Sequence, residues 1–456
     1  MLFLIITIIY LSFAFLIIKH KGEKRFLYFL IAAFIVPGNI NVIPMSLFTG
    51  FMIYSSAFVM SLFYHGEFNA RNFKQCPLFN SFMLMVLNCF LIAILDDIQG
   101  QMVGLWEGLK FFLSTYFLFF VGWFSINNNN IHSVLNQRNN FLTKLLPATI
   151  IITLYGLATF FTRTNPILDA VGLEGRFLFE NDESYRSFRV TGPNISAEVY
   201  GLACGIYCIC SIFWIKKKSK LQIFAIVMLL INMFLAGSRA AMVSIIISLL
   251  IYLVAYKGIY KTIKYFIVVI FISTCLYQVM PSSIKDLSSE ITTSVISVIN
   301  PSDIGDEMFV GSSVDGRTLQ IMTAMEYLKE HPFFGHGFGY AGKVVMKGGK
   351  HDGLMGMESH ICFIGVEYGL IYAITLIILF TNCIIYFYKN KKYAPQYAYM
   401  GIAFVVMFIF FLSGAWVGEA WYFVMPILGY ITAILYTRKK QVTGQVALSR
   451  ERVKQI

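Results

Sequence analysis

Charged side chains are scarce in this sequence. Only 13% of its 456 residues are Asp, Glu, Lys or Arg, whereas hydrophobic residues make up 57%. A soluble globular domain has about 25% charged and about 45–50% apolar residues. Apolar runs long enough to cross a hydrocarbon core of roughly 30 Å recur along the chain. The composition therefore excludes an ordinary soluble protein and predicts a polytopic membrane protein.

The alternation of apolar and polar residues that marks membrane β-strands is absent. A segment in lipid must satisfy its own backbone hydrogen bonds, which leaves helices for this chain. We predict an all-α membrane protein with about 13 transmembrane helices. The expected helices are 1–18, 26–42, 46–64, 78–95, 103–124, 145–162, 195–215, 221–237, 240–256, 265–280, 360–387, 396–413 and 420–437. Pro37, Gly38, Pro44 and Gly50 interrupt the pattern within 26–64, so a re-entrant pair stays open there.

The sequence also lacks a disulfide or metal-binding pattern. All eight cysteines lie in or beside apolar runs, and none lies in the polar interior of a long loop. His331, His336 and His351 could join His360 around a metal ion, but their spacing fits no standard site. We therefore expect no metal and no cofactor.

The net charge of +12 could indicate nucleic acid or anionic lipid, but the placement of the charges argues against nucleic acid. Lys and Arg gather in short clusters between apolar runs, which is the positive-inside pattern. With the N-terminus outside, every cluster falls on the cytoplasmic side. The cytoplasmic segments are then 19–25, 65–77, 125–144, 216–220, 257–264, 388–395 and 438–456.

Two long loops fall on the outer side of this arrangement, and loops beyond about 15 residues are usually functional or disordered. The chain divides into N-terminal membrane helices (1–162), a first outer loop (163–194), central membrane helices (195–280), a large outer loop (281–359), C-terminal membrane helices (360–437) and a cytoplasmic tail (438–456). The large loop contains an amphipathic helical pattern at 318–331, which Pro332 ends. Its apolar face is expected to lie on the membrane surface or on top of the bundle.

Arginines on the outer side are the first candidate site residues. They are Arg176, Arg186 and Arg189 in the first loop, Arg239 between two apolar runs, and Arg317 in the large loop. An Arg at membrane depth costs roughly 2.5–3.5 kcal/mol on insertion scales. Its rigid fork binds phosphate oxygens in pairs. These arginines could bind a lipid-linked pyrophosphate, and the alternative is pairing with acidic residues of the first loop.

The second candidate is the segment ESHICFIGVEYGL, in which His360 stands where the large loop re-enters the membrane. Glu367 follows after nearly two helical turns, so both side chains are expected on one helix face. Histidine exchanges protons near neutral pH, and ionisable residues within membrane helices are functional candidates. The alternatives are an interfacial histidine bonded to a loop carbonyl, and a buried carboxyl that is paired or protonated. Asp96, Asp97 and Glu419 are expected to cap helices in contact with water.

Four segments in this order resemble the O-antigen ligase and polymerase superfamily of bacterial membrane glycosyltransferases. They are RVTGPN, GSRAAMVSIIISLL, GRTLQIMTAMEYLKEHPFFGHGFG and ESHICFIGVEYGLIY. The family pattern has an Arg–Gly–Pro–Asn segment, a Ser–Arg at a helix junction, an Arg-led helix ending in His–Pro, and a His that opens a helix. The resemblance covers residues 185–375. Ile361 departs from it, because Asn commonly follows the histidine.

The resemblance implies a GT-C-like helix bundle in the bacterial inner membrane, with its active site on the periplasmic face. The implied substrates are oligosaccharide units on undecaprenyl pyrophosphate, surrounded by membrane lipid. Arg189, Arg239 and Arg317 would hold the pyrophosphate, and His360 would deprotonate the acceptor hydroxyl, with Glu367 beside it. Arg176 and Arg186 are further candidates for the pyrophosphate.

Within this superfamily we expect a polymerase of repeat units, because the total length and the long late loop fit that branch. A ligase that transfers the finished chain to lipid A-core is one alternative. A flippase or transporter is another, although such proteins usually show internal repeats and midplane charges. A chain-length regulator protein is a candidate partner.

Overall fold

The computed structural model describes residues 2–35, 50–95, 101–126, 141–170, 189–193, 196–215, 218–264, 267, 314–341, 354, 357, 359–414 and 418–454. The regular structure of these residues is helical, which confirms the all-α class. The elements are α1 (Leu2–Lys19), α2 (Gly22–Ile35), α3 (Gly50–Tyr64), α4 (Ala70–Lys74), α5 (Phe79–Ile94), α6 (Gln101–Ser114), α7 (Leu118–Trp123), α9 (Phe141–Thr162), α10 (Pro166–Asp169), α11 (Ala197–Trp214), α12 (Lys220–Leu235), α13 (Arg239–Lys257), α16 (Val314–Glu330), α17 (His360–Phe363), the π-helix η7 (Ile364–Tyr368), α18 (Gly369–Asn390), α19 (Pro395–Gly414) and α20 (Trp421–Lys454).

Every expected helix except 265–280 has a counterpart among these elements. The segment 265–280, apart from residue 267, lies outside the described residues, as does the interrupted stretch 36–49. Five described segments are long and apolar enough to cross a membrane: Phe141–Thr162, Ala197–Trp214, Arg239–Lys257, His360–Asn390 and Pro395–Gly414. The chain is therefore a membrane protein, and the full count of helices stays a prediction.

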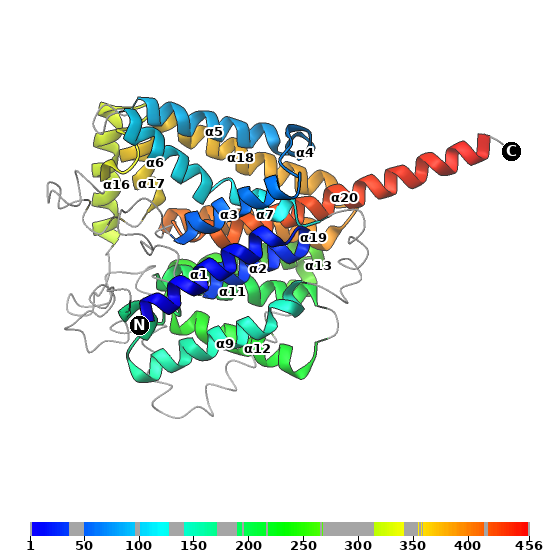
Figure 1. Cartoon of the computed structure of the whole chain (residues 1–456), viewed down its shortest axis with the longest axis horizontal. Coiled ribbons are helices and arrows are strands. Elements are labelled where there is room, and N and C mark those ends of the chain that lie inside the picture. The colour runs from blue at the N-terminus through cyan, green and yellow to red at the C-terminus, as the bar shows by residue number, and fades with distance from the viewer. Residues whose placement is uncertain are drawn as a thin grey trace.

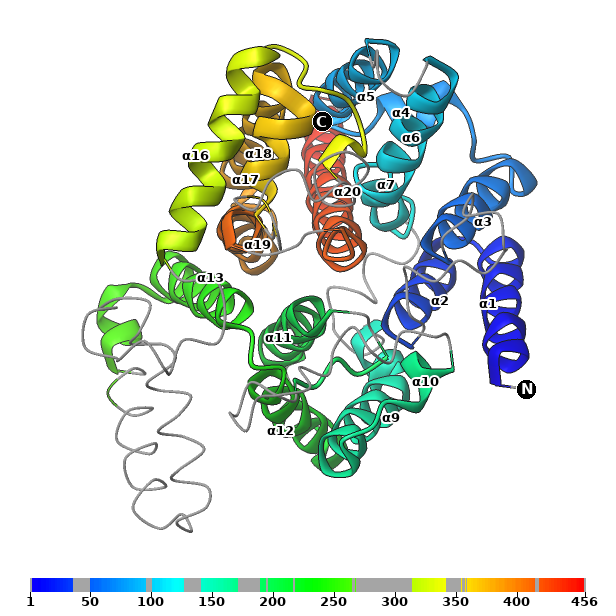
Figure 2. The same ribbon diagram turned by 90° about the vertical axis from the view of Figure 1, so that its left-hand side faces the viewer.

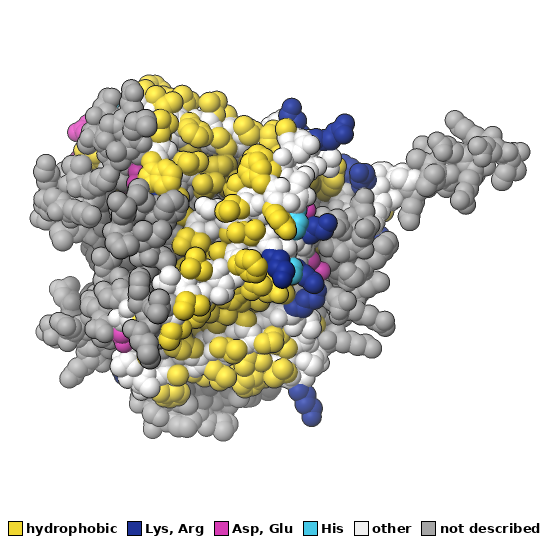
Figure 3. Space-filling model, in the orientation of Figure 1, with side chains coloured by type: hydrophobic (Ala, Val, Ile, Leu, Met, Phe, Trp, Pro, Cys, Tyr) yellow, Lys and Arg dark blue, Asp and Glu magenta, His cyan; other side chains and the backbone are white. Residues whose placement is uncertain are grey.

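The helices of the bundle run side by side, and α20 projects from one end (Figure 1). Lys and Arg gather toward that end on the face shown in Figure 3. Segments expected on the cytoplasmic side meet there, since Lys144 lies 3.3 Å from Glu23 and Arg25 lies 2.8 Å from Glu67. We call this the basic end. It agrees with the sidedness predicted from the charges.

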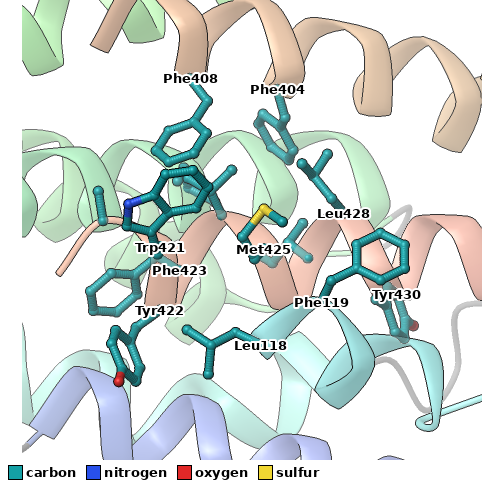
Figure 4. Packing of buried hydrophobic residues seen from close by; sticks show 14 of the residues in the cluster. Leu118, Phe119, Phe404, Phe408, Trp421, Tyr422, Phe423, Met425, Leu428 and Tyr430 are labelled. Atoms are coloured by element: carbon teal, nitrogen blue, oxygen red, sulfur yellow. The ribbon is translucent and has the colours of Figure 1, made fainter. Parts of the chain in front are cut away.

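The centre of the bundle is occupied by α20, which contacts α7, α19, α2 and α18 (Figure 2). Two glycines let α7 and α20 touch backbone to backbone. A Cβ on Gly122 would lie 1.8 Å from the Pro426 carbonyl oxygen, and one on Gly429 would lie 1.9 Å from the Phe119 carbonyl oxygen. Small residues serve such close helix contacts in lipid. Around this contact Trp421 packs against Phe408 of α19 (Figure 4).

The amphipathic helix of the large loop is α16, and it ends at Glu330, as Pro332 predicts. It runs across the end of the bundle opposite the basic end (Figures 1 and 2) and contacts α17 and η7. A Cβ on Gly365 would meet the Ala324 carbonyl oxygen at 2.7 Å, so the helix backbone sits directly on η7. Its apolar residues Leu319, Met322 and Met325 are exposed. The apolar face therefore points away from the bundle.

Candidate functional site

His360 begins a short α-helix at the end of the bundle opposite the basic end. The Ser359 hydroxyl caps this helix by accepting a hydrogen bond from the Ile361 amide, and it donates to the Ser413 carbonyl of α19 at 2.9 Å. The chain then passes through the π-helix η7 before α18 starts. π-Helical turns inside α-helices frequently mark functional sites. The start of this membrane segment is thus irregular and tied to its neighbour.

The imidazole of His360 is buried among aromatic rings. Tyr368, Tyr372 and Trp421 lie within 5.6–6.2 Å of it, measured between ring centroids. The Nε2 atom lies 3.0 Å from the Tyr372 hydroxyl oxygen, which is hydrogen-bonded in turn to the Tyr116 hydroxyl. Tyr116 comes from the break between α6 and α7. His360, Tyr372 and the distant Tyr116 therefore form one buried chain of hydrogen bonds.

Because Nε2 contacts Tyr372, Nδ1 is the ring nitrogen that would have to serve a substrate. A neutral imidazole carries one N–H donor and one acceptor nitrogen. If Nε2–H donates to Tyr372, and Tyr372 donates to Tyr116, the lone pair of Nδ1 can accept a proton. The direction of the two phenol hydrogen bonds thus decides whether His360 can be a base.

Glu367 is buried in η7 and binds the glycine-rich loop that follows α16. Its Oε1 accepts a hydrogen bond from the Ala341 amide at 3.0 Å, and its carbonyl accepts one from the Gly337 amide at 3.1 Å. These contacts match the alternative of a buried carboxyl that is paired. The role of Glu367 in orienting His360 stays a prediction, since the hydrogen bond of His360 described above goes to Tyr372.

Two glycines hold the glycine-rich loop against η7. Gly335 and Gly369 both have left-handed φ angles, +65° and +72°. A Cβ on Gly335 would lie 2.3 Å from the Glu367 carbonyl carbon, and one on Gly369 would lie 2.5 Å from the Gly335 nitrogen. The close backbone contacts at these two glycines therefore fix the loop against η7. Its His336 is buried, with Nδ1 3.0 Å from the Val366 carbonyl oxygen and Nε2 3.2 Å from a Glu330 carboxylate oxygen.

The structure places the segment that contains Arg189 beside the turn that precedes Arg239. The Val190 amide donates to the Leu235 carbonyl at the end of α12, and Arg239 opens α13 after the cap residue Ser238. Gly192 has a φ of +55°, and a Cβ there would lie 2.4 Å from the Tyr200 ring. The RVTGPN segment therefore needs glycine at this position for two reasons: the backbone is left-handed, and a side chain would collide with Tyr200.

The remaining arginines lie partly or wholly outside the described residues. Arg317 lies in the first turn of α16, while its side chain falls outside the described parts of the structure. Arg176 and Arg186 lie in the stretch 171–188, which is outside the described residues. Their proposed contacts with pyrophosphate stay predictions. Among the residues that are described, no group of three or more His, Cys, Asp or Glu side chains could hold a metal ion.

Glu419 corrects an expectation from the sequence. It was expected to cap a helix in contact with water, but it is 1% exposed in the turn before α20. Neither carboxyl oxygen has a hydrogen-bond partner among the described residues. Burial raises the pKa of Glu419 to about 8. The expectation was wrong because this turn is covered by tertiary packing, which a position between two apolar runs does not indicate.

Comparison with protein families found a match. Residues 224–377 match the family model described as O-antigen ligase. This match supports the resemblance of this region to the O-antigen ligase and polymerase superfamily. The match includes Arg239, Arg317, His360, Glu367 and Tyr372. A comparison with curated proteins found no match.

The match to the O-antigen ligase family, together with the apolar helices, indicates a membrane enzyme of glycosyl transfer in O-antigen assembly. Arg189 and Tyr116 lie outside the matched region. The RVTGPN motif linked Arg189 to the family pattern, whereas only the tertiary structure brings Tyr116 to Tyr372. Sequence reasoning missed Tyr116 and Tyr372, and it misplaced Glu419. The only sequence signal for the tyrosines was that they lie in otherwise apolar membrane segments.

Proposed function

We propose that this superfamily member is a polymerase that joins oligosaccharide repeat units carried on undecaprenyl pyrophosphate. The product would be O-antigen or a related surface polysaccharide. The observation that carries the proposal is the buried hydrogen bond between His360 and Tyr372, inside the family-matched region and at the end of the bundle opposite the basic end. In a bacterial inner membrane, that end would face the periplasm.

The proposed reaction is displacement at the anomeric carbon of a lipid-linked sugar. A hydroxyl oxygen of the acceptor forms the new bond to this carbon. The bond from the carbon to the pyrophosphate oxygen breaks, and undecaprenyl pyrophosphate leaves with the electron pair. The hydroxyl proton passes to Nδ1 of His360. A positioned base typically contributes 10²–10⁴-fold to such a step.

Tyr372 and Tyr116 are positioning residues in this mechanism, because they act through His360. As His360 takes the proton, positive charge develops on its ring. The hydrogen bond from Nε2–H to Tyr372 then involves a charged donor and becomes stronger. The phenol pair therefore favours the state in which the acceptor has lost its proton.

The arginines would hold and neutralise the leaving group. Arg189 and Arg239 lie on adjoining segments, since the Val190 amide donates to the Leu235 carbonyl just before the turn that leads to Arg239. Arg317 lies in the first turn of the helix that crosses the same end of the bundle. Preorganised cations placed where negative charge develops stabilise the transition state. Arg176 and Arg186 are additional candidates for this task. The leaving group is already activated, so the mechanism needs no nucleotide cofactor.

A ligase is the second candidate, because the matching family model is described as O-antigen ligase. The decisive experiment is a deletion strain whose surface polysaccharide is separated on a gel. Loss of a polymerase should leave core lipid with a single repeat unit. Loss of a ligase should leave no repeat on the core, while polymer accumulates on undecaprenyl pyrophosphate. Loss of every repeat from the core, with unpolymerised lipid-linked repeats retained on the cytoplasmic side, would instead indicate a transporter.

A further inference from the structure

A cavity lined by lysines opens at the basic end, far along the bundle from His360. Its walls come from α4 and the start of α5, from α18 and from α20. Its volume is about 570 Å³, which falls within the range of about 300–1,000 Å³ that ligand sites commonly have. We call it the lysine cavity. It lies outside the site of the proposed reaction.

The charge of this cavity has one sign. Lys74, Lys439 and Lys440 line it, and no Asp or Glu does. None of the three lysines forms an ion pair with a described residue. Lys440 also borders a neighbouring cavity, whose wall includes Glu23 and Glu67. Ammonium groups gathered around one cavity repel one another, and an anion between them would remove that repulsion.

The rest of the wall combines aromatic surface with uncharged polar side chains. Phe79, Tyr386 and Tyr436 contribute aromatic surface, and Asn80 and Thr443 contribute polar groups. The occupant should therefore combine negative oxygens with an apolar part.

We propose that the lysine cavity binds the phosphate headgroup of an anionic phospholipid from the membrane leaflet at the basic end. Lysine ammonium groups bind phosphate as point charges. Basic pockets between membrane helices on the cytoplasmic side take anionic headgroups in this way. The apolar wall suits the glycerol and the first acyl carbons. A lipid bound here would connect α4, α18 and α20, and it would stabilise the folded chain by mass action.

The test uses the full chain purified in detergent, with phosphatidylglycerol or phosphatidylethanolamine added at equal ratios. Native mass spectrometry counts the bound lipid, and a melting curve reports stability. The wild-type chain should retain phosphatidylglycerol and gain melting temperature with it. The triple variant Lys74→Gln, Lys439→Gln, Lys440→Gln should bind phosphatidylglycerol about tenfold to a hundredfold more weakly, given about 1 kcal/mol per lysine near an anionic surface.

The matched control removes the same charge at the same end but outside the cavity, by Lys257→Gln, Lys261→Gln, Lys264→Gln. It should bind phosphatidylglycerol as the wild-type chain does. Equal losses in both triple variants would show that net charge, and not the cavity, attracts the lipid, and they would overturn the proposal. Full retention of phosphatidylglycerol by the cavity variant would also overturn the proposal. Displacement of the lipid by inorganic phosphate would assign the cavity to a free phosphate instead.

Discussion

Replacing Tyr372 by Phe tests the hydrogen-bonded chain on which the proposed mechanism depends. The substitution removes one oxygen and leaves the buried ring in place. In the wild-type chain, that oxygen lies 3.0 Å from Nε2 of His360 and also contacts the Tyr116 hydroxyl. Without it, Nε2–H has no acceptor when the ring becomes charged. Donor binding should be unaffected, because the arginines that would hold the pyrophosphate are unchanged.

The size of the effect follows from the cost of a buried, unsatisfied donor. That cost is about 1–3 kcal/mol, which corresponds to a rate loss of about 5- to 150-fold. Tyr116→Phe removes only the outer hydrogen bond, worth about 0.5–1.5 kcal/mol, so its loss should be smaller. Because the two phenols act through one network, the double variant should lose less than the product of the single losses.

The assay is polymer formation by the purified chain from lipid-linked repeat units, across a pH series. Tyr207→Phe is the matched control, because this hydroxyl is buried in α11 without a hydrogen-bond partner among the described residues. Tyr372→Phe should lower kcat and change the pH profile, while KM for the donor stays near the wild-type value. A Tyr372→Phe chain with the wild-type kcat and pH profile would show that His360 does not act through this network.

Three further substitutions test other parts of the structure. Arg239→Lys should lose most polymer formation at normal protein levels, because a point charge cannot reproduce a bidentate fork; full activity in this variant would make Arg239 structural. Glu419→Gln tests a carboxyl whose pKa is raised by burial to about 8. The folded-state pKa of Glu419 exceeds its unfolded-state pKa, so the stability of the wild-type chain should fall relative to that of Glu419→Gln as pH rises from about 5 to about 8. The fall should be at most roughly 1.4 kcal/mol per pH unit. Melting temperatures of the two chains that change equally across this pH range would contradict the burial. Gly122→Ala should destabilise the bundle by about 1–3 kcal/mol, since the added Cβ meets the Pro426 carbonyl oxygen, whereas Gly444→Ala, with nothing within 4 Å, should not. Melting temperatures in detergent that are equal for the two alanine variants would refute the close contact of α7 and α20.

The sequence alone predicted most of the helices that the structure describes, and it predicted which basic segments lie at one end of the bundle. Apolar length predicts a membrane helix because lipid offers no other hydrogen-bond partner to the backbone. The lysine clusters predicted which ends lie together, and the contacts of Lys144 with Glu23 and of Arg25 with Glu67 agree. The ordered motifs around Arg239, Arg317 and His360 predicted the superfamily, and the family match at residues 224–377 confirmed it.

Only the tertiary structure decided which side chains meet. Tyr116 and Tyr372 are 256 residues apart, and their contact depends on how α18 and the α6–α7 break pack against each other. Glu419 looked like a surface cap and is buried. The physical reason is that the length of an apolar run reports whether a segment enters lipid, but a uniformly apolar run does not report its rotation about its own axis. In a bundle this apolar, the rotation of each helix is set by close packing at residues such as Gly122 and Gly365.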